Sequence, residues 1–129
     1  MSDDQTPHLA TVQARAALIA LIVLQVVMLL SLYSQTPPHP PLTVAPFAIA
    51  PFLGAALALA AVSLMLGPVE HMAGRVTGVL AVLAALVSYG PQKYIDAQIA
   101  LIWPSVLAGQ IAALAFAHAL WAARQRNAL

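Results

Sequence analysis

Four histidines are present among the 129 residues, and their imidazole nitrogens are the side-chain groups best suited to hold a cofactor. His71 falls in a short polar segment, and His118 falls near the end of a long apolar run. Two imidazoles at the same membrane depth could ligate a b-type haem, although no spacing motif joins these two. The alternative is that His118 bonds a neighbouring backbone carbonyl. We predict no cofactor and keep His71 and His118 as the candidate ligands of a haem or pigment.

A cluster of polar and aromatic residues interrupts the apolar sequence in YGPQKYIDAQIALIWP, residues 89–104. Lys93 and Asp96 are three residues apart and would share one face of a helix. One interpretation is an interfacial turn, in which Tyr94 anchors at the lipid headgroups while the charged pair stays hydrated. The other is an outer docking surface of Lys93, Tyr94, Asp96 and Trp103, because a carboxylate near the hydrocarbon edge is costly without a partner.

Sequence signatures of catalysis are absent. The chain has no H-E-x-x-H, G-x-S-x-G or Walker sequence. It has no cysteine, which excludes disulfides, thiolate metal sites and cysteine nucleophiles. No basic run with interleaved aromatics suggests a nucleic-acid partner. We therefore predict no catalytic residue, no metal site and no nucleic-acid partner.

Two glutamines, Gln25 and Gln110, lie at the centres of long apolar runs. Uncharged amides in lipid usually hold helices together through hydrogen bonds. We expect a packing role rather than substrate contact. In that role the two side chains meet, or each bonds a backbone carbonyl of a neighbouring helix.

Small residues indicate further places where helices could approach closely. Gly74 and Gly78 are four residues apart in GRVTG. A second four-residue stripe consists of Ser105, Gly109, Ala113 and Ala117. By contrast, the segment ALIALIVLQVVMLL is bulky on all sides, which predicts a first helix that largely faces lipid.

The elements that carry these residues are predicted to be membrane-spanning helices. The chain is 62% hydrophobic and 7% charged, whereas soluble domains have about 45–50% apolar and about 25% charged residues. A spanning helix needs about 20 mostly apolar residues. The sequence therefore predicts an all-α fold with one domain, residues 1–129, which is a four-transmembrane-helix bundle of two hairpins. The expected spans are residues 16–33, 44–66, 73–89 and 97–122.

Prolines and glycines predict where these helices begin and end. Pro7 after Thr6 suggests that the first helix starts well before its span. Gly67 and Pro68 predict a helix stop followed by a polar turn. Pro104 cannot donate to the carbonyl four residues earlier, so we expect the fourth helix to bend or restart there.

Orientation is predicted from the lysines and arginines near the span ends. One side carries four arginines and the other carries Lys93; the arginines are Arg15, Arg75, Arg124 and Arg126. The excess predicts that both termini are cytoplasmic. The expected location is the bacterial inner membrane, with a multi-pass, N-in and C-in topology.

The lack of intramembrane charge, together with the small-residue stripes and the distinctive outer loop, favours a non-catalytic accessory or structural subunit of a larger membrane complex. Its partners would be the lipid bilayer and other membrane subunits. A small homo-oligomeric transporter or channel is the first alternative and would need a water-lined path. A haem or other redox-cofactor membrane protein that uses His71 and His118 is the second.

Overall fold

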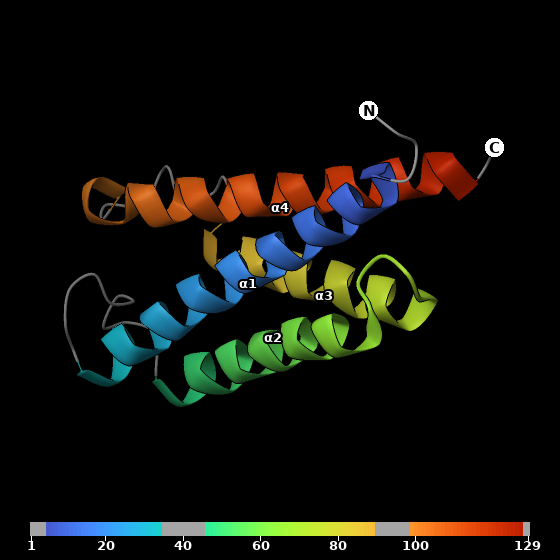
Figure 1. The fold of residues 1–129 in the computed structure, drawn as a ribbon. Coiled ribbons are helices and arrows are strands. Elements are labelled where there is room, and N and C mark those ends of the chain that lie inside the picture. The colour runs from blue at the N-terminus through green and yellow to red at the C-terminus, as the bar shows by residue number, and fades with distance from the viewer. Residues whose placement is uncertain (1–4, 35–45, 90–98, 128–129) are drawn as a thin grey trace.

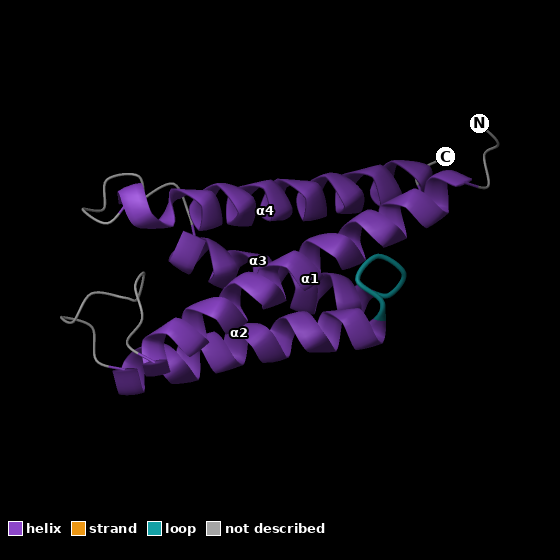
Figure 2. Cartoon of the chain, turned by 60° about the vertical axis from the view of Figure 1, so that its left-hand side comes forward, coloured by secondary structure: helices purple, strands orange, loops and turns teal. Residues whose placement is uncertain are grey.

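The chain folds into an all-helical bundle in the computed structural model, which describes residues 5–34, 46–89 and 99–127. These ranges contain no strand (Figure 2), so the prediction of an all-α fold is confirmed. The four helices are α1 (Gln5–Ser34), α2 (Pro46–Leu66), α3 (Met72–Tyr89) and α4 (Ile99–Asn127).

Helix boundaries follow the predicted apolar runs where glycine or proline ends them, and exceed them elsewhere. The predicted runs 44–66 and 73–89 differ from α2 and α3 by no more than two residues at either end. The first helix begins at Gln5, close to Pro7 and well before the apolar run, as the sequence suggested. The fourth extends past its apolar run to Asn127, because alanines and good helix formers such as Arg124 continue the helix.

Pro104 lies inside α4, and the helix runs unbroken from Ile99 through it to Asn127. The predicted restart at this proline is therefore wrong. Pro104 stands in the second turn of the helix, where its ring removes the hydrogen bond to the Ala100 carbonyl while later bonds remain. The loss of one bond near a helix end does not separate two helices.

The four helices form a closed ring in which each one packs on two neighbours (Figure 1). The pairs α1–α4 and α2–α3 make the most extensive contacts, and α1–α2 and α3–α4 complete the ring. A smaller diagonal contact joins α1 to α3. The beginning of α1, the end of α4 and the α2–α3 turn share one end of the bundle (Figure 1), which we call the turn end.

The buried face of α1 contains both small and bulky residues. Ala14, Ala17, Leu18 and Leu21 are at most 5% exposed and form part of the main core cluster. Their spacing of three and four residues places them on one stripe of the helix. This stripe packs into the bundle, mainly against α4, whereas most of the remaining apolar segment of the first helix, including Ile19, Val23 and Val27, stays exposed.

The turn between α2 and α3 is tight, as the glycine and proline predict. Leu66 ends α2, and Gly67 follows with a φ of 90°, a left-handed conformation that glycine adopts without a Cβ clash. Gly67, Pro68 and Val69 are buried, whereas Glu70 and His71 are exposed. The polar part of the predicted turn is therefore limited to these last two residues.

Two helical segments, His8–Ser31 and Trp103–Gln125, are long and apolar enough to cross a membrane. The other two helices contribute shorter apolar segments, Ala50–Leu66 and Met72–Ser88. At 1.5 Å per residue each of these shorter segments extends about 26 Å, against about 30 Å for a typical hydrocarbon core.

Candidate functional site

Polar side chains gather at the turn end, where they bond the backbone of neighbouring elements. Gln13 on α1 donates from Nε2 to the carbonyl oxygen of Ala115 on α4 at 2.8 Å. The same nitrogen lies 3.1 Å from Nδ1 of His118. The ring of His118 also lies 6.3 Å from the ring of Trp121, with the planes tilted by 46°. His118 is thus held at the α1–α4 contact.

His71 lies in the α2–α3 turn, on a different element from Gln13 and His118. Its backbone N–H donates to the Gly67 carbonyl at 3.4 Å, and its own carbonyl accepts from the Arg75 N–H at 3.0 Å. Both histidines are exposed, and their recorded contacts join each to different neighbours. In the described ranges no group of three or more His, Cys, Asp or Glu side chains could hold a metal ion.

Arg15 and Glu70 connect α1 to the end of α2 and to the turn. Arg15 donates from Nη1 to the Leu64 carbonyl at 3.2 Å, and this carbonyl belongs to the last turn of α2. Such terminal carbonyls have no partner within their own helix, and a cation beside them is favourable.

Glu70, in the α2–α3 turn, has a pKa on which opposite effects act. Burial raises the pKa of Glu70. The backbone N–H groups of Glu70 and Val69, the Thr11 hydroxyl and the Arg15 charge outweigh burial and lower this pKa below its ordinary value.

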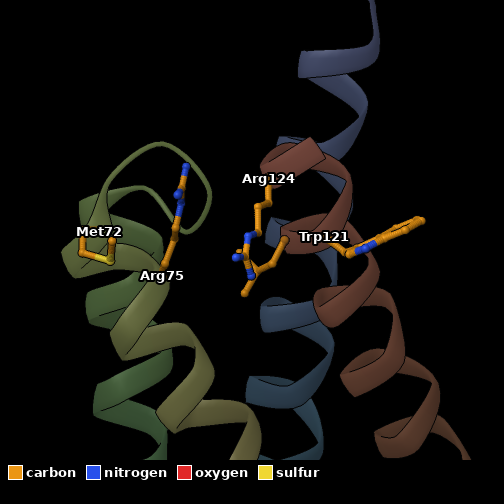
Figure 3. A pocket seen from close by; sticks show the side chains of 5 residues that line it. Met72, Arg75, Trp121 and Arg124 are labelled. Atoms are coloured by element: carbon orange, nitrogen blue, oxygen red, sulfur yellow. The ribbon is translucent and has the colours of Figure 1, made fainter. Parts of the chain in front are cut away.

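Arg75 and Arg124 face one pocket at the turn end, between α3 and α4 (Figure 3). The pocket has a volume of about 560 Å³ and is lined by Met72, Arg75, Leu120, Trp121 and Arg124. Arg75 donates from Nε to the Val69 carbonyl at 2.6 Å, which fixes its guanidinium beside the turn. Arg124 extends from α4 toward α3 (Figure 3). None of the five lining residues is acidic, so the pocket is cationic.

A second pocket of about 550 Å³ continues along the same two helices toward the middle of the bundle. Leu120 lines both pockets. Apart from Gln110, the lining side chains are apolar; they are Val79, Val82, Leu83, Leu86, Ala113, Leu114, Phe116, Ala117 and Leu120. We refer to this second pocket as the α3–α4 groove.

The predicted small-residue positions on α3 lie at close contacts. A Cβ on Gly74 would meet the Gly67 carbonyl oxygen, and a Cβ on Gly78 would meet Cζ of Phe116 and lie 2.7 Å from Oγ of Ser63. Both contacts are possible only because these positions have no side chain. The sequence predicted that helices approach closely at the two glycines, but it did not identify the residues that they contact.

The stripe on α4 is only partly buried. Gly109 and Ala113 are buried and Ser105 is half-buried, but Ala117 is exposed to the α3–α4 groove. A spacing of four residues drifts around a helix that has 3.6 residues per turn, so the last member of the stripe leaves the contact.

The two central glutamines occupy different environments. Gln25 is 1% exposed, and its Oε1 accepts no hydrogen bond from the described part of the chain. Gln110 is half-buried and lines the α3–α4 groove. The predicted pairing is therefore not formed through Oε1 of Gln25.

The predicted outer docking surface falls mostly outside the described residues. Lys93, Tyr94 and Asp96 belong to the segment 90–98, whose structure is not described. Trp103, the fourth member, is 52% exposed near the start of α4.

Sequence reasoning missed Gln13 and Ser63, both of which bond the backbone of another helix. A signal was present for Gln13, because it stands next to Ala10, Ala14 and Ala17, whose spacing of three and four residues is typical of a helix contact. Ser63 had no comparable signal, since a serine in an apolar helix often bonds its own backbone.

No family model, curated protein or solved structure matches the chain.

Proposed function

We propose that this chain is a small bacterial inner-membrane protein with four spans and cytoplasmic termini, and that it acts as a non-catalytic accessory subunit of a larger membrane complex. Its role in this proposal is to supply a preformed helical scaffold to other membrane subunits.

Membrane location is supported by the two long apolar helices and by the apolar character of the bundle surface. Large hydrophobic side chains are exposed along all four helices, among them Val23, Val62, Leu83 and Ile111. The shorter α2 and α3 would fit a bilayer through slight local thinning and through arginines that extend to the headgroups. Arg15, Arg75 and Arg124 stand in the right place for this, since all three belong to the turn end.

The single observation that carries the accessory role is that polar side chains at the turn end donate hydrogen bonds to backbone carbonyls of neighbouring elements. Gln13 bonds the Ala115 carbonyl, Arg15 the Leu64 carbonyl and Arg75 the Val69 carbonyl. Each donor ends on the backbone of another element, and neither Gln13 nor Arg15 lines either of the two pockets. This use of polar groups favours a rigid scaffold over a catalytic centre.

Purification of the tagged chain from its native membranes in mild detergent would test the proposal. The expected result is a heteromeric assembly on blue-native electrophoresis, in which a second membrane protein is present in fixed stoichiometry and is absent from an untagged control. A homomeric mass would favour the transporter or channel alternative. A Soret absorption band that His71→Ala and His118→Ala each abolish would favour the redox alternative.

A further inference from the structure

Two arginines on different helices share a pocket at the turn end with no acidic neighbour in its lining. Arg75 belongs to the first turn of α3 and Arg124 to the last part of α4. The bond from Arg75 Nε to the Val69 carbonyl fixes this side chain and directs the remaining guanidinium nitrogens elsewhere. Arg15 differs from both, because its guanidinium bonds the Leu64 carbonyl and its charge acts on Glu70.

The cationic pocket lies next to the apolar α3–α4 groove. Leu120 lines both spaces, and from Leu120 to Gln110 the groove follows eleven residues of α4, or about 15 Å. The helices α3 and α4 that line both spaces pack less extensively than the pairs α1–α4 and α2–α3. Positive charge therefore lies at the turn end of the bundle, and a space lined by apolar side chains lies between it and the middle of the bundle.

This arrangement matches the chemistry of one ligand class. Guanidinium groups bind phosphate oxygens through paired, charge-assisted hydrogen bonds. Basic pockets between helices on the cytoplasmic side of a membrane bind the headgroups of anionic lipids. A free phosphate would use the arginines but not the groove, whereas an apolar helix would use the groove and leave both guanidinium groups without a counter-ion.

We propose that a glycerophospholipid of the surrounding bilayer, with a net anionic headgroup, binds between α3 and α4. Arg75 and Arg124 hold its phosphate, and one acyl chain lies along the α3–α4 groove past Leu120. This inference rests on the membrane location proposed above, and it does not require a partner subunit.

Quenching of Trp121 fluorescence by brominated lipids would test the site. The chain has two tryptophans, so Trp103→Phe leaves Trp121 as the single reporter; this residue lines the pocket, and its exposed ring points away from Arg75 (Figure 3). The full-length variant would be reconstituted in phosphatidylcholine vesicles that contain increasing fractions of dibrominated phosphatidylglycerol or dibrominated phosphatidylcholine. We expect phosphatidylglycerol to quench more strongly at equal fractions. Arg124→Gln should weaken this preference about fivefold, the effect of one arginine near an anionic surface.

Matched variants distinguish lipid binding in this pocket from a general attraction between anionic lipids and positive charge at the bundle surface. Arg15→Gln removes the same charge at the same end of the bundle and should leave the preference unchanged, and Arg124→Lys should retain most of it. Arg124 is exposed and makes no hydrogen bond to the described residues, so its replacement tests binding without breaking such a bond. Arg75→Gln should act like Arg124→Gln, provided that the circular dichroism spectrum is unchanged.

Several results would overturn the lipid site. These are equal quenching by the two lipids, an equal loss of preference in Arg15→Gln and Arg124→Gln, and displacement of the brominated lipid by millimolar inorganic phosphate. Failure of both lipids to reach Trp121 because a second copy covers the groove would also overturn it. A chain that inserts into vesicles without lipid preference refutes this inference alone. A chain that does not insert refutes the proposed membrane location as well.

Discussion

Oγ of Ser63 donates a hydrogen bond of 2.7 Å to the backbone carbonyl of Gly74 and so joins α2 to α3 inside the bundle. Ser63 is 0% exposed, and the absence of a side chain at Gly74 and at Gly78 lets the two helices come close enough for this bond. The hydrogen bond and the two glycines therefore belong to one close helix contact.

Ser63→Ala should destabilise the fold by about 1 kcal/mol, the usual net contribution of one buried hydrogen bond. The effect stays modest because Thr77 also donates to the Gly74 carbonyl, at 3.1 Å. The measurement is thermal unfolding in detergent micelles, followed by circular dichroism. Thr77→Ala is the control, since its hydroxyl bonds only carbonyls of α3, and it should cost less. An equal or larger loss in Thr77→Ala would contradict a special role for the α2–α3 bond.

Gly78→Ala should destabilise by about 1–3 kcal/mol, the typical result of overpacking a core. The new Cβ would meet Cζ of Phe116 and Oγ of Ser63, and the Phe116 ring, 1% exposed, could relieve the contact only by shifting toward the α3–α4 groove that it lines. Gly54→Ala is the matched control on α2, because nothing lies within 4 Å of its new Cβ. That control should stabilise by up to about 1 kcal/mol through better helix propensity. Similar shifts in both variants would disprove the close contact.

Gln25→Leu should stabilise the isolated protein by about 1 kcal/mol, because its buried amide oxygen has no hydrogen-bond partner among the described residues and such an oxygen costs about 1–3 kcal/mol. Leucine has a similar size and no polar atom to satisfy. The comparison is the unfolding midpoint of wild type and variant in the same detergent. Gln110→Leu, at the half-buried glutamine of α4, serves as the companion variant. A clear loss of stability in Gln25→Leu would show that this amide has a hydrogen-bond partner and would restore the predicted pairing role.

Acidification should weaken the contact that Glu70 makes with α1. Burial raises the pKa of Glu70, but N–H groups, the Thr11 hydroxyl and the Arg15 charge lower it below its ordinary value. A carboxyl with a lowered folded-state pKa stabilises the fold above the unfolded value, about 4.3, and this contribution is lost as pH falls through the folded-state pKa. The unfolding midpoint between pH 3 and 7 should therefore fall less in Glu70→Gln than in wild type. Asp96→Asn, the control, should follow the wild-type curve if Glu70 is responsible.

Single cysteines would test the proposed topology without background, since the chain has no cysteine. With cytoplasmic termini, His39→Cys and Lys93→Cys should react with a membrane-impermeant maleimide from outside. Asn127→Cys should react only after the membrane is permeabilised. The reverse labelling pattern would show that the orientation is inverted, and reaction of all three in intact cells would contradict a four-span bundle.

The amino-acid sequence by itself determined that the chain is helical and that α2 must stop before Gly67. Uninterrupted runs of alanine, leucine and valine form helices, and Gly67 followed by Pro68 ends α2 because glycine adopts the left-handed turn at that point. The clustering of Gly74 and Gly78 also indicated a close contact before its partners were known. These features are local, so neighbouring residues are enough to predict them.

Only the tertiary structure decided which face of each helix is buried and which polar groups meet. In a soluble helix, polar residues mark the outer face, but here the residues that face outward and those that face inward are equally apolar, so periodicity carries no such contrast. Leu21 is buried and Val23 is exposed, although neither residue type reveals the difference. The approach of Gln13 to His118 and of Arg75 to Arg124 depends on how α1 and α3 pack on α4. That packing is set by shape complementarity between distant segments, which the order of residues along one helix does not reveal.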